Sequence, residues 1–197
     1  MEQLQRATRA NWMYPPIDGW TVDQVEELYL PYDTDWELID GRIVTYSDTS
    51  WWHNHVRDEL YIALRTALRR PYTVGMSRWT EINNRTAVSP DLVVFDHRGL
   101  DIHTLVATPV ANVALVVEVH SPCSHAADRH LRPGLFAEAG IGLFWRVERG
   151  EDAVPEIHEH QLDPSTGRYG EATRHTSTLK THVPFPIEVD LRSLIDF

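Results

Sequence analysis

One stretch of the sequence constrains the fold more than any other. Residues 113–119 read Val-Ala-Leu-Val-Val-Glu-Val and are apolar at every position except Glu118. A run of this length and composition is typical of a β-strand that is covered on both faces. The sequence therefore predicts a sheet with helices on both faces, with one costly carboxylate on its most apolar strand.

The segments around this strand predict an α/β (α+β) domain with a mixed sheet. Thr21 and Gln24 form a capping-box pattern, which predicts a short helix starting at Thr21. Asp40-Gly41 predicts the turn of a hairpin over residues 36–47. Helical spacing of apolar residues predicts a long helix over residues 51–69. The remaining expected elements are strands at 72–76, 78–82, 91–95 and 143–148, helical structure at 124–139 divided or kinked at Pro133, two or three antiparallel strands after residue 154, and a last helical turn at 191–195.

Length, charge and cysteine content limit the class of protein. A chain of 197 residues suits one domain, and we expect a lead-in with a short helix over residues 1–33 and the main domain over residues 34–197. A net charge of −11 argues against binding to nucleic acid by bulk charge alone, because phosphate contacts need Lys and Arg. The single cysteine, the lack of an apolar run near the ~18 residues that cross a bilayer, and a start without a signal-peptide pattern predict a cytoplasmic protein that does not enter a membrane.

Two carboxylates stand at the ends of expected strands. Asp91 begins a strand after Ser89-Pro90, and Glu118 lies near the end of residues 113–119. One interpretation is structural: Asp91 caps a turn and Glu118 pairs with an arginine. The other is functional: the two carboxylates hold a divalent cation, because Mg²⁺ is commonly bound by one or two carboxylates together with waters and substrate phosphates. The residues alone leave both interpretations open.

Several motifs occur in the order known from one protein family. They are Glu37-Leu38-Ile39-Asp40-Gly41, His53, Pro90-Asp91, Glu118-Val119-His120-Ser121-Pro122, Asp128-Arg129, Phe136-Ala137-Glu138-Ala139-Gly140 and the closing stretch from Pro184-Phe185 to Leu194. This ordered set resembles the Uma-two family, small bacterial proteins placed in the PD-(D/E)XK restriction-endonuclease-like superfamily. The resemblance covers about residues 34–196, nearly the whole chain.

The resemblance implies a restriction-endonuclease-like mixed sheet flanked by helices, with additional antiparallel strands. It implies Asp91 and Glu118 as metal ligands, the main-chain carbonyl of Val119 as a third ligand, and Mg²⁺ or Mn²⁺ as the ion. The inherited chemistry is hydrolysis of phosphodiester bonds, so DNA is the expected substrate. Glu37 and His53 are expected near the site in a supporting role. A homodimer is a further expectation, because many superfamily members need two sites to cut two strands.

The sequence departs from the superfamily at the third catalytic group. That group is a lysine, usually two residues after the acid, where this chain has His120. In the Uma-two branch the lysine lies on the following helix, where this chain has Arg132. Arginine can stabilise negative charge on a transferring phosphate, but it does not readily give up a proton. His120 is an alternative proton carrier, because imidazole titrates near neutrality.

Two hypotheses about function follow from this departure. The first is a metal-dependent endonuclease acting on DNA, in which Arg132 stabilises the transferring phosphate. The second is a catalytically weak or inactive nuclease-fold protein that serves as a nucleic-acid or protein interaction module. The arginine and the net charge of −11 motivate the second.

Two other groups of residues are weaker candidates. Glu156, His158 and His160 alternate on an expected strand, where they form either a metal triad or, as most polar strand faces do, a solvent-facing surface. His120 with Cys123 is a conceivable nucleophilic pair, but no triad context surrounds it, and a lone cysteine is most often an inert buried residue.

Overall fold

The computed structural model describes residues 12–28, 35–46, 49–120 and 126–196, and a seven-stranded mixed sheet lies at its centre. The strand order is β11–β10–β9–β8–β6–β3, with β12 paired to β10. The pair β8–β9 is parallel, and the other neighbouring pairs are antiparallel. The strands are β3 (Tyr72–Met76), β6 (Leu92–Asp96), β8 (Val113–Val119), β9 (Leu143–Arg149), β10 (Pro155–Asp163), β11 (Arg168–Tyr169) and β12 (Thr173–His175).

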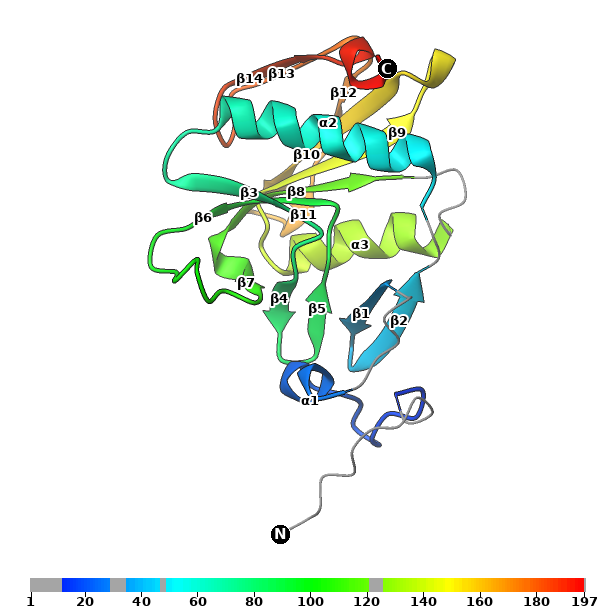
Figure 1. The fold of residues 1–197 in the computed structure, drawn as a ribbon, viewed down its shortest axis with the longest axis vertical. Helices are drawn as coiled ribbons and strands as arrows, with labels where there is room; N and C mark the ends of the chain where they lie inside the picture. The colour runs from blue at the N-terminus through cyan, green and yellow to red at the C-terminus, as the bar shows by residue number, and fades with distance from the viewer. Residues whose placement is uncertain (1–11, 29–34, 47–48, 121–125, 197) are drawn as a thin grey trace.

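The long helix α2 (Trp51–Ala67) covers one face of this sheet (Figure 1). It begins after Ser50, whose hydroxyl accepts a hydrogen bond from the backbone N–H of His53 and so caps the first turn. Its stripe of Val56, Leu60 and Leu64 recurs every four residues and is fully buried in the core under the helix. The helix predicted over residues 51–69 is therefore confirmed, with its end two residues earlier.

The helix α3 (Ala126–Glu138) covers the opposite face (Figure 1). Phe136 near its C-terminal end packs on Phe144 of β9, with ring centroids 5.6 Å apart. Gly140 follows the helix with a φ of +78°, a conformation that favours glycine and ends the helix. The helix continues through Pro133 as one element, so the chain is not divided there.

The strand β8 occupies the interior position that its apolar run predicts. Every residue of β8 except Ala114 is buried, and its neighbours are β6 and β9. Because side chains alternate along a strand, Val117 and Val119 join the core under α2, whereas Val116 joins the core under α3. Glu118 therefore lies on the α3 face of the sheet.

A second sheet of five strands has the order β2–β1–β5–β4–β7. Its first hairpin is the predicted one, and Asp40 and Gly41 at the turn take positive φ values of 50° and 74°. The strands are β1 (Asp35–Ile39), β2 (Arg42–Tyr46), β4 (Thr80–Asn83), β5 (Thr86–Val88) and β7 (Thr108–Pro109). In Figure 1 this sheet lies on the same side of the central sheet as α3.

The short helix α1 (Val22–Glu26) packs on the second sheet. Thr21 caps it in a complete capping box with Gln24, as the sequence predicts. Val22 and Val25 share a small core with Leu38 of β1 and Ala87 of β5. The expected boundary between residues 33 and 34 lies outside the described residues, so the division into a lead-in and a main domain remains a prediction.

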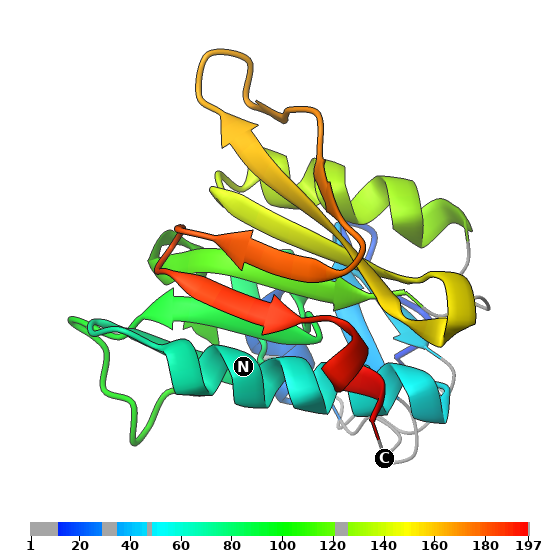
Figure 2. The same ribbon diagram turned by 90° about the horizontal axis from the view of Figure 1, so that it is seen from above.

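The C-terminal part completes the layer that contains α2. The antiparallel pair β13 (Thr178–Thr181) and β14 (Ile187–Asp190) lies beside α2 (Figure 2), and a 3-10 helix at Arg192–Ile195 packs on the same helix. The last helical turn predicted there is confirmed. The structure has more strands after residue 154 than the two or three that were predicted. The additional strands were missed because β11 to β14 have only two to four residues each and are too short to show a hydrophobic period. Within the described residues, no helix has the length and apolar character needed to cross a membrane.

Candidate active site

Asp91 and Glu118 meet at one end of the central sheet. The antiparallel register of β6 and β8 pairs Leu92 with Val117, which places Asp91, just before β6, next to Glu118. The backbone N–H of Val119 donates to Oδ2 of Asp91 at 2.7 Å and holds the two strand ends together. The structure thus brings together the two acids that the sequence singled out.

Arg132 of α3 and Glu37 of β1 complete a buried ionic group on this end of the sheet. One terminal nitrogen of Arg132, Nη2, donates to both carboxylate oxygens of Glu37 at 2.7 Å, and the other, Nη1, donates to Oε1 of Glu118. Only 2% of the Glu37 side chain and 10% of the Arg132 side chain are exposed. The arginine therefore connects α3 to both sheets through two buried carboxylates.

Tyr46 of β2 belongs to the same group, although the sequence reasoning missed it. Its hydroxyl donates to Oε2 of Glu37 at 2.6 Å, and its ring centroid lies 5.5 Å from the Arg132 guanidinium carbon. The backbone N–H of Ser89 donates to the other oxygen of Glu37 at 2.6 Å. The Asp40-Gly41 turn could have indicated this contact from the sequence. The hairpin register that it sets pairs Glu37 with Val44, which places Tyr46 diagonally across from Glu37 on the same face.

His53 in the first turn of α2 contacts Asp91. Its Nε2 lies 3.2 Å from Oδ1 of Asp91, and its Nδ1 lies 3.3 Å from the side-chain oxygen of Asn54. Burial lowers the pKa of His53, but the hydrogen bond and negative charge of Asp91 outweigh it, so the pKa is raised from its ordinary value. Asp91 is thus held from one side by His53 and from the other by the backbone of Val119.

The group has more negative than positive charge. Glu37, Asp91 and Glu118 face the permanent charge of Arg132 and the imidazole of His53. Burial raises the pKa of Glu118 above its ordinary value; Arg132 opposes this shift, and the negative charges of Asp91 and Glu37 add to it. A buried excess of carboxylates is the kind of donor set that a hard divalent cation stabilises, so the residues present fit such an ion.

The side chains that fit the ion are two carboxylates rather than a larger cluster. Within the described parts of the chain, no group of three or more His, Cys, Asp or Glu residues is arranged to hold a metal. Two carboxylates are sufficient for Mg²⁺, which keeps several waters when bound. Asp91 and Glu118 are accordingly the candidate ligands, and the role of the Val119 carbonyl stays a prediction.

His120 lies just past the same end of β8. It is buried, and its backbone N–H donates to the carbonyl of Val147 at 2.8 Å, which extends the pairing of β8 with β9. Cys123, the other member of the weaker nucleophilic candidate, lies outside the described residues. Glu37, His53, Asp91, Glu118, Arg132 and His120 are thus all buried or nearly so around one end of β6 and β8.

His158 and His160 form neither a metal triad nor an open polar face. β10 is an interior strand, between β9 and β12, so both side chains are half-buried on the α3 face. Glu156, the third residue of the proposed triad, pairs with Arg174 at 2.6 Å. The His160 ring stacks on Phe144 with centroids 5.6 Å apart.

We expect His160→Phe to make the fold less sensitive to acid. Burial lowers the pKa of His160, a backbone hydrogen bond with Gly170 opposes this, and Arg146 and His158 lower it further. A lowered pKa means that the unfolded chain binds a proton first, so stability is lost as the pH falls below the unfolded value of about 6.5. Urea denaturation at pH 7 and pH 5 should show a smaller loss for His160→Phe than for the wild type. His103→Gln, in an exposed loop, is the control and should lose as much stability as the wild type. An equal loss in His160→Phe and the wild type would contradict the prediction.

Comparisons with known proteins identify the family and the fold of the chain. The model of the Uma2 family, described as "Putative restriction endonuclease", matches residues 22–191. The chain belongs to the Uma2 family. The restriction-endonuclease-like mixed fold expected from the sequence is likewise confirmed. No curated protein matches the chain.

One solved structure has a similar fold. It is the crystal structure, at 1.96 Å resolution, of a putative nuclease belonging to DUF820 from Anabaena variabilis ATCC 29413. The similarity has a TM-score of 0.65 and covers 88% of this Uma2 chain and 96% of that one, at 14% sequence identity. At this identity the likeness shows a shared fold, and the activity of this chain has to be argued from its own site.

Proposed function

We propose that this Uma2 protein is a metal-dependent endonuclease that hydrolyses phosphodiester bonds in DNA. The observation that carries the proposal is the group of Glu37, Asp91 and Glu118 at one end of β6 and β8, where Arg132 pairs with Glu37 and Glu118 and Asp91 contacts His53 and the backbone of Val119. Charged groups are costly to bury, and three carboxylates with one arginine and one histidine form a larger ionic group than a structural ion pair. Membership of the family described as a restriction endonuclease supports the same reading.

Asp91 and Glu118 are the proposed ligands of Mg²⁺ or Mn²⁺, with the main-chain carbonyl of Val119 as the proposed third. A bound ion would supply positive charge that stabilises the phosphoryl group during hydrolysis. The chain's own residues orient these ligands: His53 and the N–H of Val119 hold Asp91, and Arg132 holds Glu118. His120 is the proposed proton carrier, and the proposal includes a cytoplasmic location and a homodimer that cuts two strands.

Cleavage assays on purified protein test the proposal. Supercoiled plasmid and single-stranded DNA are incubated with Mg²⁺, with Mn²⁺ and with a chelator, and strand breaks are counted on gels. Cleavage that requires the metal supports the proposal. No cleavage of either DNA with either metal would contradict it.

A second candidate function is an interaction module without turnover, and one observation favours it. Arg132 is committed to Glu37 and Glu118, and a guanidinium does not readily release a proton. The position that carries lysine in the Uma-two pattern is thus filled by a residue that neutralises the two acids. In this reading the ionic group is a structural remnant of the metal site.

Arg132→Lys separates the two candidates. We expect metal-dependent cleavage by Arg132→Lys to be at least tenfold faster than by the wild type, because lysine keeps the charge and can take part in proton transfer, which typically contributes ~10²–10⁴-fold. The measurement is the initial rate of plasmid nicking at equal protein concentration. A rate no higher than that of the wild type, in a variant that is still folded, would show that arginine does not limit turnover.

A further inference from the structure

Arg132, which the sequence suggested as the cation that contacts the phosphate, is not free to make that contact in the structure. Arg132 donates to three carboxylate oxygens, both of Glu37 and one of Glu118, and its side chain is 10% exposed. Moving the guanidinium to a substrate would leave two buried carboxylates without their partner, which is strongly unfavourable. A phosphate that approaches Glu118 therefore needs a different cation.

Arg146 of β9 is the cation beside Glu118 on the same face of the sheet. The parallel register of β8 and β9 pairs Glu118 directly with Arg146, and neighbouring strands lie only about 4.8 Å apart. The Arg146 side chain is 27% exposed, compared with 10% for Arg132. Arg146 therefore lies next to the candidate metal ligand and is accessible from solvent.

The guanidinium of Arg146 also has unused hydrogen-bonding capacity. Its Nε lies 3.2 Å from Oε1 of Glu148 but makes no directed hydrogen bond there. Across the described stretches of the chain this is its one ion pair, and neither terminal nitrogen donates a hydrogen bond to a described residue. Glu148 is itself shared, since its Oε2 lies 3.6 Å from Nε2 of His158. A guanidinium whose two terminal nitrogens have no acceptor is suited to a bidentate contact with phosphate oxygens.

The next residue in the same row does not compete with Arg146 for an anion. His158 of β10 is paired in register with Arg146 on the side away from Glu118. Burial and the positive charge of Arg146 lower the pKa of His158 from its ordinary value, Arg174 adds to this, and Glu148 and Glu156 oppose it, so the net shift favours the neutral imidazole. Among the residues paired in register across β8, β9 and β10, namely Glu118, Arg146 and His158, Arg146 thus supplies the permanent positive charge next to Glu118.

We propose that Arg146 binds a phosphate of the nucleic-acid strand that approaches Glu118, so that Arg146, and not Arg132, is the phosphate contact of this site. The inference rests on the proposed function, because it names the residue through which the same site meets its substrate. The ligand is the sugar–phosphate backbone, so the contact positions the strand without reading its sequence.

Binding of labelled oligonucleotides tests this contact apart from cleavage. Fluorescence anisotropy in a chelator is measured for single-stranded and duplex DNA over a range of NaCl concentrations. We expect Arg146→Ala to weaken binding about tenfold and to reduce the slope of log Kd against log[NaCl] by about 0.7–0.9, the value for one lost phosphate contact. Arg146→Lys should keep the slope, because it keeps the charge.

Arg98→Ala is the matched control, because it removes one positive charge from an arginine that is also paired with an acid. Arg98 pairs with Asp96 at the opposite end of β6 from Asp91. We expect the Kd and the salt slope of Arg98→Ala to be close to those of the wild type. Thermal melts establish that each variant is folded, and Arg146→Gln replaces Arg146→Ala if the alanine variant is not.

The outcomes separate this inference from the function on which it rests. Wild-type protein that binds neither single-stranded nor duplex DNA would overturn both the role of Arg146 and the proposed function. Wild-type binding with Arg146→Ala indistinguishable from Arg98→Ala would overturn the role of Arg146 alone. A loss in Arg146→Ala, or in the Arg146→Gln variant that replaces it, with the salt slope retained in Arg146→Lys, would establish the phosphate contact, whether or not the protein cleaves DNA.

Discussion

Arg132→Ala is expected to lower the free energy of unfolding by about 3–5 kcal/mol, the usual cost of removing one partner from a buried ionic group. The variant leaves Glu37 and Glu118 without the guanidinium that donates to three of their oxygens. Both carboxylates are almost completely buried, so water does not replace the lost donor. Urea denaturation at neutral pH, with the midpoint and slope fitted together, measures the change.

The expected loss can be assigned to the carboxylates by a second variant. Glu118→Gln removes one of the two negative charges but keeps an oxygen that accepts from Arg132. If the cost comes from uncompensated charge, Arg132→Ala should be less destabilising in the Glu118→Gln background than in the wild type. Arg98→Ala, whose side chain is exposed, is the control and should leave the denaturation midpoint nearly unchanged. A change below about 1 kcal/mol for Arg132→Ala would show that the group is not held together by its charges.

Asp91→Asn and Glu118→Gln are each expected to reduce metal-dependent DNA cleavage at least a hundredfold. A bound ion supplies several kcal/mol of stabilisation to the charge on the phosphoryl group, and about 1.4 kcal/mol corresponds to one factor of ten. Each amide keeps the shape of the side chain but removes the charge that holds the ion. Single-turnover cleavage with Mg²⁺ and with Mn²⁺, at several metal concentrations, measures the effect.

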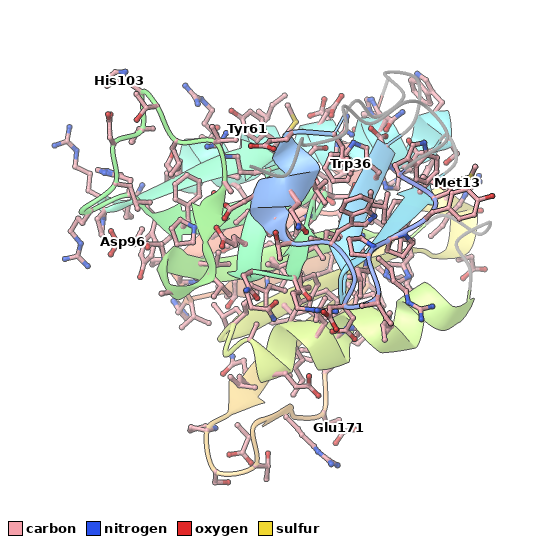
Figure 3. The ribbon with its side chains drawn as sticks, turned by 90° about the horizontal axis from the view of Figure 1, so that it is seen from below. Met13, Trp36, Tyr61, Asp96, His103 and Glu171 are labelled. Carbon is pink, nitrogen blue, oxygen red and sulfur yellow. The ribbon has the colours of Figure 1, made fainter. Side chains whose placement is uncertain are left out.

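Asp96→Asn is the matched control for Asp91→Asn, because the two aspartates flank opposite ends of β6. Figure 3 shows Asp96 at the edge of the molecule, away from Trp36, the neighbour of Glu37 in β1. Asp96 pairs with Arg98 and has no contact with the ionic group around Arg132. Equal losses in Asp91→Asn and Asp96→Asn, or full activity of Asp91→Asn and Glu118→Gln in folded protein, would contradict the assignment of the site.

Local sequence patterns were sufficient for the elements that carry the site. The apolar run at 113–119 determines a strand with two covered faces, and the period of Val56, Leu60 and Leu64 determines α2. The Asp40-Gly41 turn determines the register that places Glu37 on β1. These features depend on residues close together in the chain, which is why the sequence shows them.

The acids of the candidate site were also within reach of the sequence, but their partners were not. Asp91 and Glu118 are recognisable because a carboxylate beside an apolar strand is costly to bury. The family motifs placed Glu37 and His53 near them. Nothing local indicated that Arg132 would join Glu37, which is 95 residues away in the chain, or that Tyr46 would hold the same carboxylate.

The sequence by itself determined the type of each main element and the family, and it indicated Asp91 and Glu118 as the candidate metal ligands. Only the tertiary structure decided which charges meet. It committed Arg132 to Glu37 and Glu118, placed His53 on Asp91, and left Arg146 partly exposed beside Glu118. The reason is that strand and helix periods follow from neighbouring residues, whereas an ion pair depends on strand order and on the helix that crosses the sheet, and these bring together residues that no local pattern connects.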